Sequence, residues 1–519
     1  MLNVNNLNVT INNKKYIENL SFSIDDGDKL AIIGEEGNGK STLAKLLAKD
    51  PQVFSYAKVT GTINTNGATV GFLKQFLDDD WNNQEILQYF LKQNPTDEED
   101  YSVFNNYSEL TKLFASLGLD KALLESEQKI GDLSGGEKVK LQLIKLMLNS
   151  PDILILDEPT NDLDISTLEW LENFIVNFEK PIIFISHDEQ LLERTANCIL
   201  HVEQLRKKTL CKVTFASMSY KDYINKRSND LNKQAQIASF ERAQDKIQMS
   251  RWQKIYNKVE HMQSTISRGD PHGGRLLKKK MKSVKAQERR FERNREEQTE
   301  FPDTEESIYL DFGTSAVHNT KLVCDIFYPE LQVGDKVLAN NISLKVVGPE
   351  KVVIVGNNGT GKTTFLKKLA NEMTLSSDLR IGYMPQNYQD VLSKYKSVED
   401  FVNENIYDKL TLTLIRTFLA CLKFTPEEVA GDISDLSGGQ KAKLFLAKLM
   451  LEQNNVLILD EPTRNLSPLS NPVIREALSQ FNGTIIAISH DRKFISQIAT
   501  RVLEFTKEGL IPITSVRYS

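Results

Sequence analysis

Long apolar runs are absent from the sequence of 519 residues. No stretch approaches the roughly 20 apolar residues of a membrane-spanning helix, and the first residues lack the charged-then-apolar pattern of a signal peptide. The four cysteines lie far apart and form no C-x-x-C pair, which excludes a disulfide framework and a zinc module as expectations. The sequence therefore predicts a cytoplasmic protein without a membrane domain.

Charge is unevenly distributed along the chain. Residues 205–300 hold 24 Lys and Arg against 11 Asp and Glu, a net charge of +13. The remainder of the chain has a net charge of −19. The length of 519 residues corresponds to about three or four domain-sized units. A share of 40% apolar residues is enough to form their buried cores. We therefore expect a basic middle segment between two folded, acidic flanks.

Two copies of one module flank the basic middle segment. GEEGNGKST at residues 34–42 matches GNNGTGKTT at residues 356–364, and LSGGE matches LSGGQ. ILILDEPT likewise matches VLILDEPT, and IFISHD matches IAISHD. The last three pairs of motifs are each separated by 303 residues, so the copies align without a gap from LSGG to SHD. The sequence is a tandem repeat.

Each copy places a glycine loop between an apolar strand and an amphipathic helix. In such a loop, backbone N–H groups and the helix N-terminus hold phosphate oxygens, the Lys reaches the outer phosphates, and the next hydroxyl meets Mg²⁺. One such motif alone is compatible with a chance glycine turn, but two in the same context are not. The predicted ATP-binding residues of the loops are Gly34, Gly37, Gly39, Lys40, Ser41, Thr42, Gly356, Gly359, Gly361, Lys362, Thr363 and Thr364.

An unbroken apolar strand ends in Asp-Glu in both copies, as expected for a parallel sheet that is buried on both faces. Asp157 and Asp460 are predicted to orient Mg²⁺, together with the loop hydroxyls of Ser41 and Thr363. Glu158 and Glu461 are predicted to polarise the attacking water. Two acids that cap a strand against solvent are the simpler interpretation, but the glycine loops favour an ATPase that forms ADP and phosphate.

These motifs, and LSGGE and LSGGQ above all, resemble those of the ATP-binding-cassette (ABC) ATPases, over residues 1–204 and 301–519. The resemblance implies that two cassettes pair head to tail within one monomeric chain, with each ATP between the P-loop of one cassette and the LSGG signature of the other. A signature Ser that opens a helix offers N–H groups to the γ-phosphate. The implied signature residues are Ser134, Gly135, Gly136, Ser437, Gly438 and Gly439.

Further catalytic residues follow from the same resemblance. The implied metal- and water-sensing Gln residues and phosphate-contacting His residues are Gln75, Gln386, His187 and His490. One position departs from the family pattern: the D-loop carboxylate is present as Asp164 in the first cassette, whereas Ser467 stands 303 residues later. We therefore expect unequal turnover in the two ATP sites.

The basic middle segment, residues 205–300, is predicted to be a long α-helical hairpin linker, so the fold class is α/β with two tandem P-loop ABC ATPase domains and this linker between them. Apolar residues spaced by three and four predict a seam between two helices. Pro271 and nearby glycines predict a tip near residues 265–275, with Gly273 and Gly274 among the helix stops. The predicted seam residues are Ile255, Val259, Met262, Ile266, Leu277, Met281, Val284 and Phe291.

The return half of the hairpin has eight Lys or Arg and one Glu within residues 275–290. A solvated helix face or a coiled-coil spacer usually balances its charges, whereas clustered basic residues neutralise phosphates. Structured RNA is recognised largely through its backbone and shape. The predicted RNA- and ribosome-binding residues are Arg268, His272, Arg275, Lys278, Lys279, Lys280, Lys282, Lys285, Arg289 and Arg290.

Tandem cassettes with a long basic linker and no membrane domain resemble the F subfamily (ABC-F), whose members act on the ribosome. The resemblance implies ATP and Mg²⁺ as cofactors, a ribosome-associated cytoplasmic location, and large-subunit rRNA and P-site tRNA as partners. ATP would close the cassettes, the closed form would bind the ribosomal exit site, and hydrolysis would release it. Within the linker, residues 264–274 would reach the peptidyl-transferase region.

The choice within this subfamily depends on added segments. Only 57 residues separate Gln75 from Leu133, against 49 between Gln386 and Leu436, so no large arm is expected in the first cassette. Only 29 residues follow His490, so no C-terminal coiled coil is expected. Both features resemble ribosome-protection factors that dislodge lincosamides, streptogramins A and pleuromutilins and so confer antibiotic resistance. A housekeeping ABC-F translation factor and a soluble ATPase subunit of a transporter stay open as alternatives.

Overall fold

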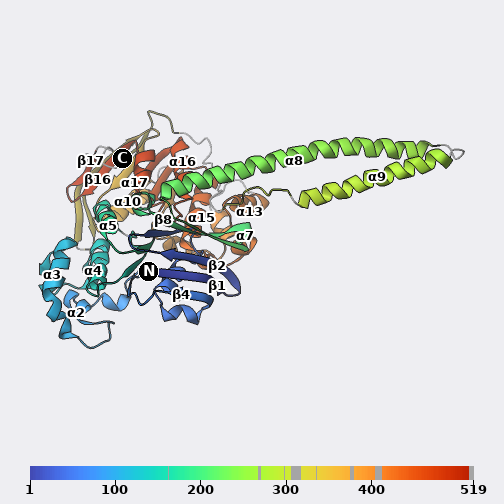
Figure 1. Cartoon of the computed structure of the whole chain (residues 1–519). Coiled ribbons are helices and arrows are strands. Elements are labelled where there is room, and N and C mark those ends of the chain that lie inside the picture. Colours follow the sequence, from blue (N-terminus) through green and yellow to red (C-terminus); the bar gives the residue numbers. More distant parts are fainter. Residues whose placement is uncertain are drawn as a thin grey trace. The chain divides into compact units, whose positions relative to one another are not determined.

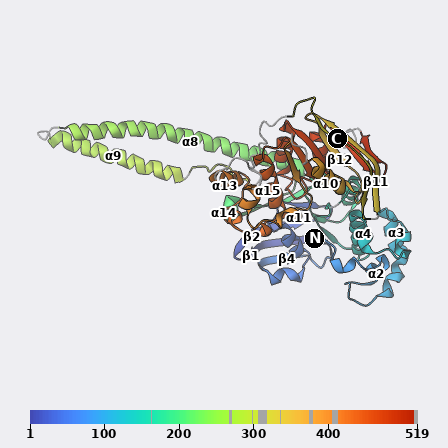
Figure 2. The same cartoon turned by 180° about the vertical axis from the view of Figure 1, so that it is seen from behind.

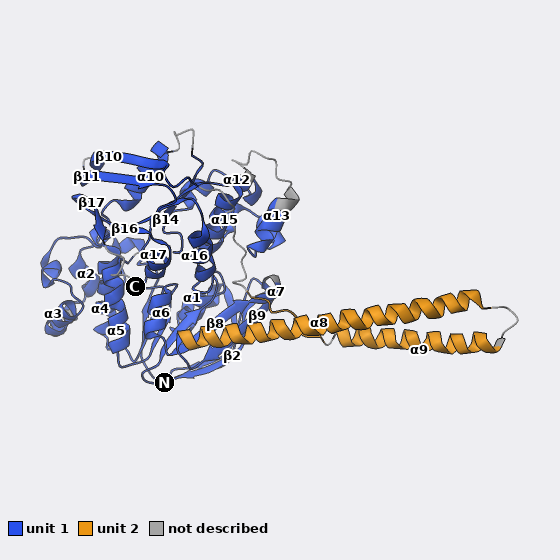
Figure 3. Cartoon of the chain, turned by 90° about the horizontal axis from the view of Figure 1, so that it is seen from above, with its two compact units in different colours: residues 1–220, 305–519 blue, residues 221–304 orange. Residues whose placement is uncertain are grey.

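Two compact units make up the computed structural model, which describes residues 1–161, 163–266, 271–296, 298–304, 317–334, 336–373, 379–403 and 412–513. Unit 1 combines residues 1–220 and 305–519 and contains both cassettes, and unit 2 covers residues 221–304 (Figure 3). Unit 1 extends beyond residue 204, the predicted end of the first cassette, because a strand at residues 210–216 pairs with the sheet of that cassette.

A six-stranded sheet forms the centre of each cassette, with five parallel strands and one antiparallel edge strand. The orders are β5-β6-β7-β3-β8-β9 and β13-β14-β15-β12-β16-β17. The strands of the first sheet are β3 (Lys29–Ile33), β5 (Val70–Leu73), β6 (Ile153–Asp157), β7 (Ile182–Ile185), β8 (Cys198–Gln204) and β9 (Leu210–Ala216). Those of the second are β12 (Lys351–Val355), β13 (Ile381–Met384), β14 (Val456–Asp460), β15 (Thr484–Ile488), β16 (Arg501–Thr506) and β17 (Gly509–Ile513).

The predicted apolar strands β6 and β14 are buried at every residue and each lies between two parallel neighbours. Because the carboxyl ends of parallel strands meet at one edge of a sheet, Asp157 and Asp460 lie at the same edge as the P-loops that follow β3 and β12. The prediction of two tandem α/β domains is confirmed.

Antiparallel strands form a second, smaller sheet in each cassette. They are β1 (Leu2–Ile11), β2 (Lys14–Ile24) and β4 (Ala57–Asn64) in the first and β10 (Leu322–Val333) and β11 (Lys336–Val347) in the second. Along β2, buried Leu20, Phe22 and Ile24 alternate with exposed residues, so one face of the sheet is apolar. This face packs in one hydrophobic core with the helix that follows the first P-loop.

Helices pack around both sheets (Figure 1, Figure 2). The first cassette has α1 (Lys40–Leu47), α2 (Ile86–Leu91), α3 (Tyr107–Ser116), α4 (Gly135–Met147), α5 (Ile165–Asn177), α6 (Glu189–Thr195) and α7 (Leu205–Lys208). The second has α10 (Lys362–Met373), α11 (Gln389–Leu392), α12 (Val398–Asn403), α13 (Leu412–Cys421), α14 (Pro426–Ala430), α15 (Gly438–Leu451), α16 (Asn471–Gln480) and α17 (Arg492–Ile498). Within the described residues, no helix is both long and apolar enough to cross a membrane.

Unit 2 is dominated by two antiparallel helices, α8 (Tyr220–Thr265) and α9 (Pro271–Glu296), which run side by side in all views. Their 46 and 26 residues correspond to about 69 Å and about 39 Å at 1.5 Å per residue. Gly273 and Gly274 were predicted to stop a helix, and this prediction is wrong. Both lie in the first turn of α9, because Pro271 fits the first position of a helix.

The seam between the two helices follows the predicted positions on α9 but differs from them on α8. Val259 and Val284 are buried as predicted, but Ile255 and Met262 are 45% and 39% exposed. Trp252 takes part instead: its side chain is buried, and its Nε1–H donates to the carbonyl oxygen of Val284 at 2.9 Å. The register was hidden because an aromatic residue with a polar N–H occupies a seam position.

Candidate functional site

Both P-loops take the conformation that their glycines permit. Gly34 has φ 147°, and a Cβ there would lie 2.2 Å from the carbonyl oxygen of Val202. At Gly361, φ is 103° and a Cβ would lie 2.8 Å from Leu338. Side chains are therefore excluded at both positions. The loops lead directly into α1 and α10, whose first residues are the P-loop lysines.

The P-loop lysines fold back on their own loops. Lys40 Nζ donates to the carbonyl oxygens of Gly34 at 2.9 Å and Glu35 at 3.0 Å. Lys362 Nζ makes the equivalent bonds to Gly356 at 2.7 Å and Asn357 at 2.8 Å. Both ammonium groups are thus positioned inside the loop, where phosphate oxygens bind in proteins with this motif.

The predicted Mg²⁺ ligands meet at the edge of each sheet. Ser41 Oγ donates to Asp157 Oδ1 at 3.0 Å. Burial and the neighbouring Glu158 raise the pKa of Asp157 to about 6, and burial raises the pKa of Asp460 to about 6. Both carboxylate oxygens of Asp460 are buried without a hydrogen-bond partner among the described residues. Oxygen ligands that lack a protein partner fit a hard cation such as Mg²⁺.

Glu158 is held by three side chains. Gln75 Nε2 and Asn161 Nδ2 donate to its Oε2 at 2.7 Å and 2.8 Å, and His187 Nε2 lies 3.3 Å from its Oε1. Burial alone would raise the pKa of Glu158, but the hydrogen bond to His187 and nearby cations lower this pKa to about 2. The structure thus brings the predicted Gln, Glu and His of the first site together around an ionised carboxylate.

Glu461 has a different environment at the equivalent place. Burial and Asp460 raise the pKa of Glu461 to about 8, and its Oε1 has no hydrogen-bond partner in the described part of the chain. The backbone N–H of His490 donates to Oε2 at 3.2 Å, and His490 Nε2 lies 3.7 Å from Oε1. Burial lowers the pKa of His490 to about 4, so its ring is neutral at pH 7. Gln386 contacts Thr363 instead, at 3.4 Å.

Glu158 and Glu461 have φ values of 49° and 51°, in the left-handed region that non-glycine residues rarely adopt. The same unusual conformation recurs at both motif positions. Strained backbone of this kind concentrates at catalytic positions, where the surrounding structure holds a side chain in place.

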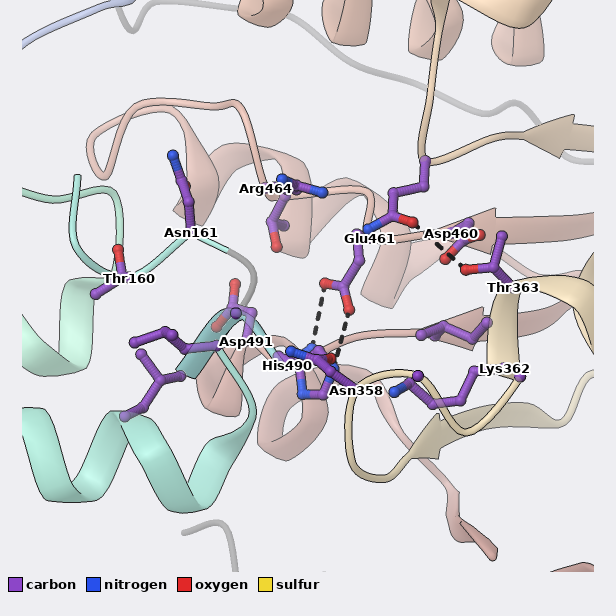
Figure 4. Close-up of a pocket in the computed structure, with 18 of the residues that line it drawn as sticks. Thr160, Asn161, Asn358, Lys362, Thr363, Asp460, Glu461, Arg464, His490 and Asp491 are labelled. Atoms are coloured by element: carbon purple, nitrogen blue, oxygen red, sulfur yellow. Dashed lines mark hydrogen bonds and ion pairs between the residues drawn. The ribbon is translucent and has the colours of Figure 1, made fainter. Parts of the chain in front are cut away.

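Residues of both cassettes line a cavity of about 600 Å³ at the second site (Figure 4). Lys362, Thr363 and Asp460 come from the second cassette, whereas Gly135 and Asn161 come from the first. Gly135 lies in the LSGG signature of the first cassette. The P-loop of one cassette therefore faces the signature of the other across this cavity, as the sequence resemblance implies.

The first site joins the two cassettes through acidic residues of its P-loop. Lys443 Nζ lies 2.7 Å from Glu35 Oε2, and Ser467 Oγ donates to Glu35 Oε1 at 2.8 Å. The carboxylate of Glu36 accepts a hydrogen bond from the backbone N–H of Gly439 in the second signature. Neither glutamate was predicted to have a role, although both stand in GEEGNGKST, because the P-loop motif leaves these positions unspecified.

Both signatures begin a helix with a capping box. The hydroxyl of Ser134 accepts from the backbone N–H of Glu137, and the hydroxyl of Ser437 accepts from that of Gln440. The LSGGE and LSGGQ sequences therefore fix the starts of α4 and α15. In the second signature, the backbone N–H of Gly439 donates to the carboxylate of Glu36 in the opposing P-loop, and the N-terminus of a helix favours such an anion.

Most of the predicted basic residues lie on α9 and are exposed: His272, Arg275, Lys278, Lys279, Lys280, Lys282, Lys285, Arg289 and Arg290. Arg268 lies outside the described residues. Tyr16 lies against Gly39 of the first P-loop, whereas Tyr328 of the second cassette is buried and donates to Glu372 at 2.6 Å. Tyr328 is therefore a core residue.

Known proteins resemble this chain over most of its length. The ABC transporter family model matches residues 17–161 and 339–464. The putative ATP-binding protein YdiF of Bacillus subtilis is 30% identical, over 98% of this chain and 80% of that protein. ABC transporter F family member 2 of Arabidopsis thaliana is 30% identical, over 78% of this chain and 57% of that protein.

Among solved structures, one of the complex of archaeal ribosomal stalk protein aP1 and archaeal ribosome recycling factor aABCE1 has a TM-score of 0.55 and 18% identity. The match covers 96% of this chain and 87% of the other, and it shows the shared fold. The chain therefore belongs to the ATP-binding-cassette family and, within it, to the F family, as a protein with two tandem ATPase domains.

Proposed function

We propose that this chain is an ATP-driven ribosome-binding factor whose cassettes close on ATP and whose α8–α9 hairpin contacts ribosomal RNA. The observation that carries the proposal is the exposed basic face of α9. The rest of the chain has a net negative charge and contains two sets of ATPase motifs. The archaeal recycling factor that shares the fold is itself named for its action on the ribosome.

ATP hydrolysis would use the residues that the two sites bring together. Lys40 and Lys362 would bind phosphate oxygens, and the carboxylates of Asp157 and Asp460 would hold Mg²⁺, which neutralises phosphate charge when bound. Glu461 lines the cavity of the second site, and its pKa of about 8 lies near neutral pH, so its ionised form is suited to accept the proton of an attacking water.

Binding to RNA would rest on charge rather than on base recognition. On α9 the Lys and Arg side chains are exposed over most of the helix, while the apolar seam faces α8. Exposed cations that neutralise phosphates release counterions, so they bind RNA with little sequence preference. Large-subunit rRNA and P-site tRNA at the exit site are the proposed contacts, with residues 264–274 as the part nearest the peptidyl-transferase region.

The finer proposal is that this contact dislodges antibiotics from the peptidyl-transferase region. A hairpin whose longer helix has 46 residues supports it, because such a helix spans about 69 Å, enough to reach a distant site on a ribosome. Drug release follows if the drug-bound and drug-free ribosomes differ in affinity for this protein. A housekeeping translation factor would use the same hairpin without conferring resistance.

Two measurements test the proposal at its two levels. Purified protein with both catalytic glutamates replaced (Glu158→Gln, Glu461→Gln) should co-sediment with ribosomes in ATP at moderate ionic strength, and its absence from the ribosome pellet would overturn ribosome binding. Expression in a drug-sensitive host should raise resistance to at least one drug that binds the peptidyl-transferase region. A growth defect on deletion without any gain in resistance would indicate the housekeeping role, and co-purification with a membrane protein would indicate the transporter subunit.

A further inference from the structure

Buried ion pairs join the cassettes away from both P-loops. The guanidinium of Arg475 on α16 forms two hydrogen bonds to the carboxylate of Glu189 on α6, at 2.7 Å and 3.0 Å. Arg492 on α17 pairs with Glu172 on α5. The four side chains are only 2%, 6%, 3% and 5% exposed, respectively. We call these two ion pairs the crossed pairs.

The crossed pairs have an unusual relation in sequence. Glu172 and Arg475 are separated by 303 residues, and so are Glu189 and Arg492. This is the interval that relates the two cassettes, so each arginine stands where the other cassette has a glutamate. Each arginine also pairs with the glutamate that corresponds to the other arginine. Equivalent positions of the two cassettes therefore carry opposite charges, and each position meets the other, non-equivalent position across a pseudo-two-fold axis.

Neighbouring residues follow the same exchange of charge. In the first cassette, Arg194 donates to Glu172 at 2.7 Å from within the same cassette. The equivalent residue 303 positions later is Gln497, whose side-chain oxygen accepts from Arg475 Nε at 2.8 Å. A second arginine at that position would repel Arg475. The neighbouring residue therefore suits the charge that it contacts: Arg194 is cationic beside the carboxylate of Glu172, and Gln497 is neutral beside the guanidinium of Arg475.

Pairing between like cassettes would bury like charges against one another, although Glu172 would keep Arg194 and Arg475 would keep Asp491 of their own cassettes. Across a two-fold axis, a residue meets its own counterpart or the neighbours of that counterpart. Two first cassettes would bury the carboxylates of Glu172 and Glu189 against the same carboxylates, and two second cassettes would bury four guanidinium groups together. Burying like charges against one another is strongly destabilising, and such repulsion is a common source of binding specificity.

We infer that the crossed pairs determine which cassettes associate: they allow a first cassette to pair with a second cassette and exclude pairing between like cassettes of two chains. The partner of each cassette is therefore the oppositely charged half of this same sequence. The inference is independent of ribosome binding and of ATP hydrolysis, because none of the four residues belongs to a P-loop, a signature or a catalytic position.

Charge exchange in the full-length protein tests the inference. One variant reverses the acidic side (Glu172→Arg, Glu189→Arg), a second reverses the basic side (Arg475→Glu, Arg492→Glu), and a third combines all four changes. Amide hydrogen exchange of α6 and α17 reports whether the cassettes remain paired. We expect exchange about a hundredfold faster in either reversed variant, since breaking a buried pair is costly. Exchange in the combined variant should be slower than in either reversed variant but faster than in the wild type, because Arg194 and Asp188 keep charges that suit the original pairs.

Two outcomes would overturn the inference: wild-type protection in the reversed variants, or a combined variant no better protected than either of them. Circular dichroism establishes that each variant is folded. If a reversed variant does not fold, Glu189→Gln, Arg475→Gln and their combination give the same test, because the combined variant should be better protected than either single one.

The excluded pairing is measured separately. Replacement of all four residues by Met removes the charges and keeps much of the side-chain volume, and the apolar contact is expected to hold the cassettes together. Light scattering at matched protein concentrations should then detect a larger dimer fraction than in the wild type. An equal dimer fraction in both proteins would contradict a role in excluding like pairs.

Discussion

Ser467 Oγ donates a hydrogen bond to Glu35 Oε1 at 2.8 Å, from the D-loop of the second cassette to the P-loop of the first. The first cassette has Asp164 where the second has Ser467, and the second P-loop has Asn357 where the first has Glu35. The carboxylate that is missing from the second D-loop is thus supplied by the P-loop that this D-loop contacts. The departure noticed in the sequence is half of a reciprocal exchange: each site keeps one carboxylate at these positions, which the P-loop supplies at the first site and the D-loop at the second.

Nucleotide affinity should respond to the acidic P-loop. Glu36 accepts from the N–H of Gly439, which in this family faces the γ-phosphate, so ATP must displace a carboxylate of like charge. We expect Glu36→Asn to tighten ATP binding at the first site by about tenfold, or about 1.4 kcal/mol. The matched control, Asn358→Glu in the second P-loop, should weaken binding. Titration with a fluorescent ATP analogue measures both, and unchanged affinity in Glu36→Asn would exclude competition.

The two catalytic glutamates should contribute unequally to turnover. Glu158 is occupied by Gln75, Asn161 and His187, whereas Glu461 has a free oxygen beside a cavity. We therefore expect Glu461→Gln to retain at most about a fifth of the steady-state ATPase rate and Glu158→Gln to retain more than about half. Equal residual rates in the two variants would refute unequal turnover.

Sequence motifs predict contacts within one cassette better than contacts between the two cassettes. Short motifs predicted the contacts within a cassette, such as Ser41 with Asp157, because each motif occupies a fixed place on a parallel sheet. Contacts such as Lys443 with Glu35 join residues about four hundred positions apart and involve positions that no motif specifies. Their partners become visible only once the cassettes are placed face to face.

The hairpin illustrates a second limit. A rule based on aliphatic spacing selected Ile255 and Met262, because both fit a spacing of three and four. The actual seam passes through Trp252, whose indole N–H is satisfied by the carbonyl oxygen of Val284. Spacing alone does not predict whether an aromatic residue with a polar group lies on the buried or the exposed face of a helix, because its burial depends on a hydrogen-bond partner in another element.

Stability should depend on pH through Glu35. Burial alone would raise the pKa of Glu35, but Lys443, Ser470 and Ser467 lower it below its usual value. Because the folded-state pKa is lowered, the ionised carboxylate stabilises the protein above the usual pKa of about 4.3, and this contribution is lost as the pH falls through the folded-state pKa. Glu35→Gln should cost about 3 kcal/mol at neutral pH.

The measurement is the melting temperature of wild type and Glu35→Gln across a pH series. The difference between them should stay constant from about pH 7 to about pH 5 and shrink below about pH 4, where wild-type Glu35 becomes protonated and resembles Gln. A difference that does not shrink below about pH 4 would show that the ionised form of Glu35 makes no special contribution.

Salt dependence distinguishes the basic face of α9 from charge in general. Replacing Lys278, Lys279 and Lys280 by Ala should weaken ribosome binding, and the slope of log affinity against log salt should become shallower by about two, since each lost phosphate contact removes about 0.7 to 0.9. The matched control replaces three exposed lysines of α8, Lys246, Lys254 and Lys258, and changes the net charge equally. Affinity is measured by co-sedimentation with ribosomes at several salt concentrations. If both triple variants changed the slope equally, the interaction would depend on net charge, and α9 would not be the RNA-binding face; a change confined to the α9 variant ties the contact to this helix.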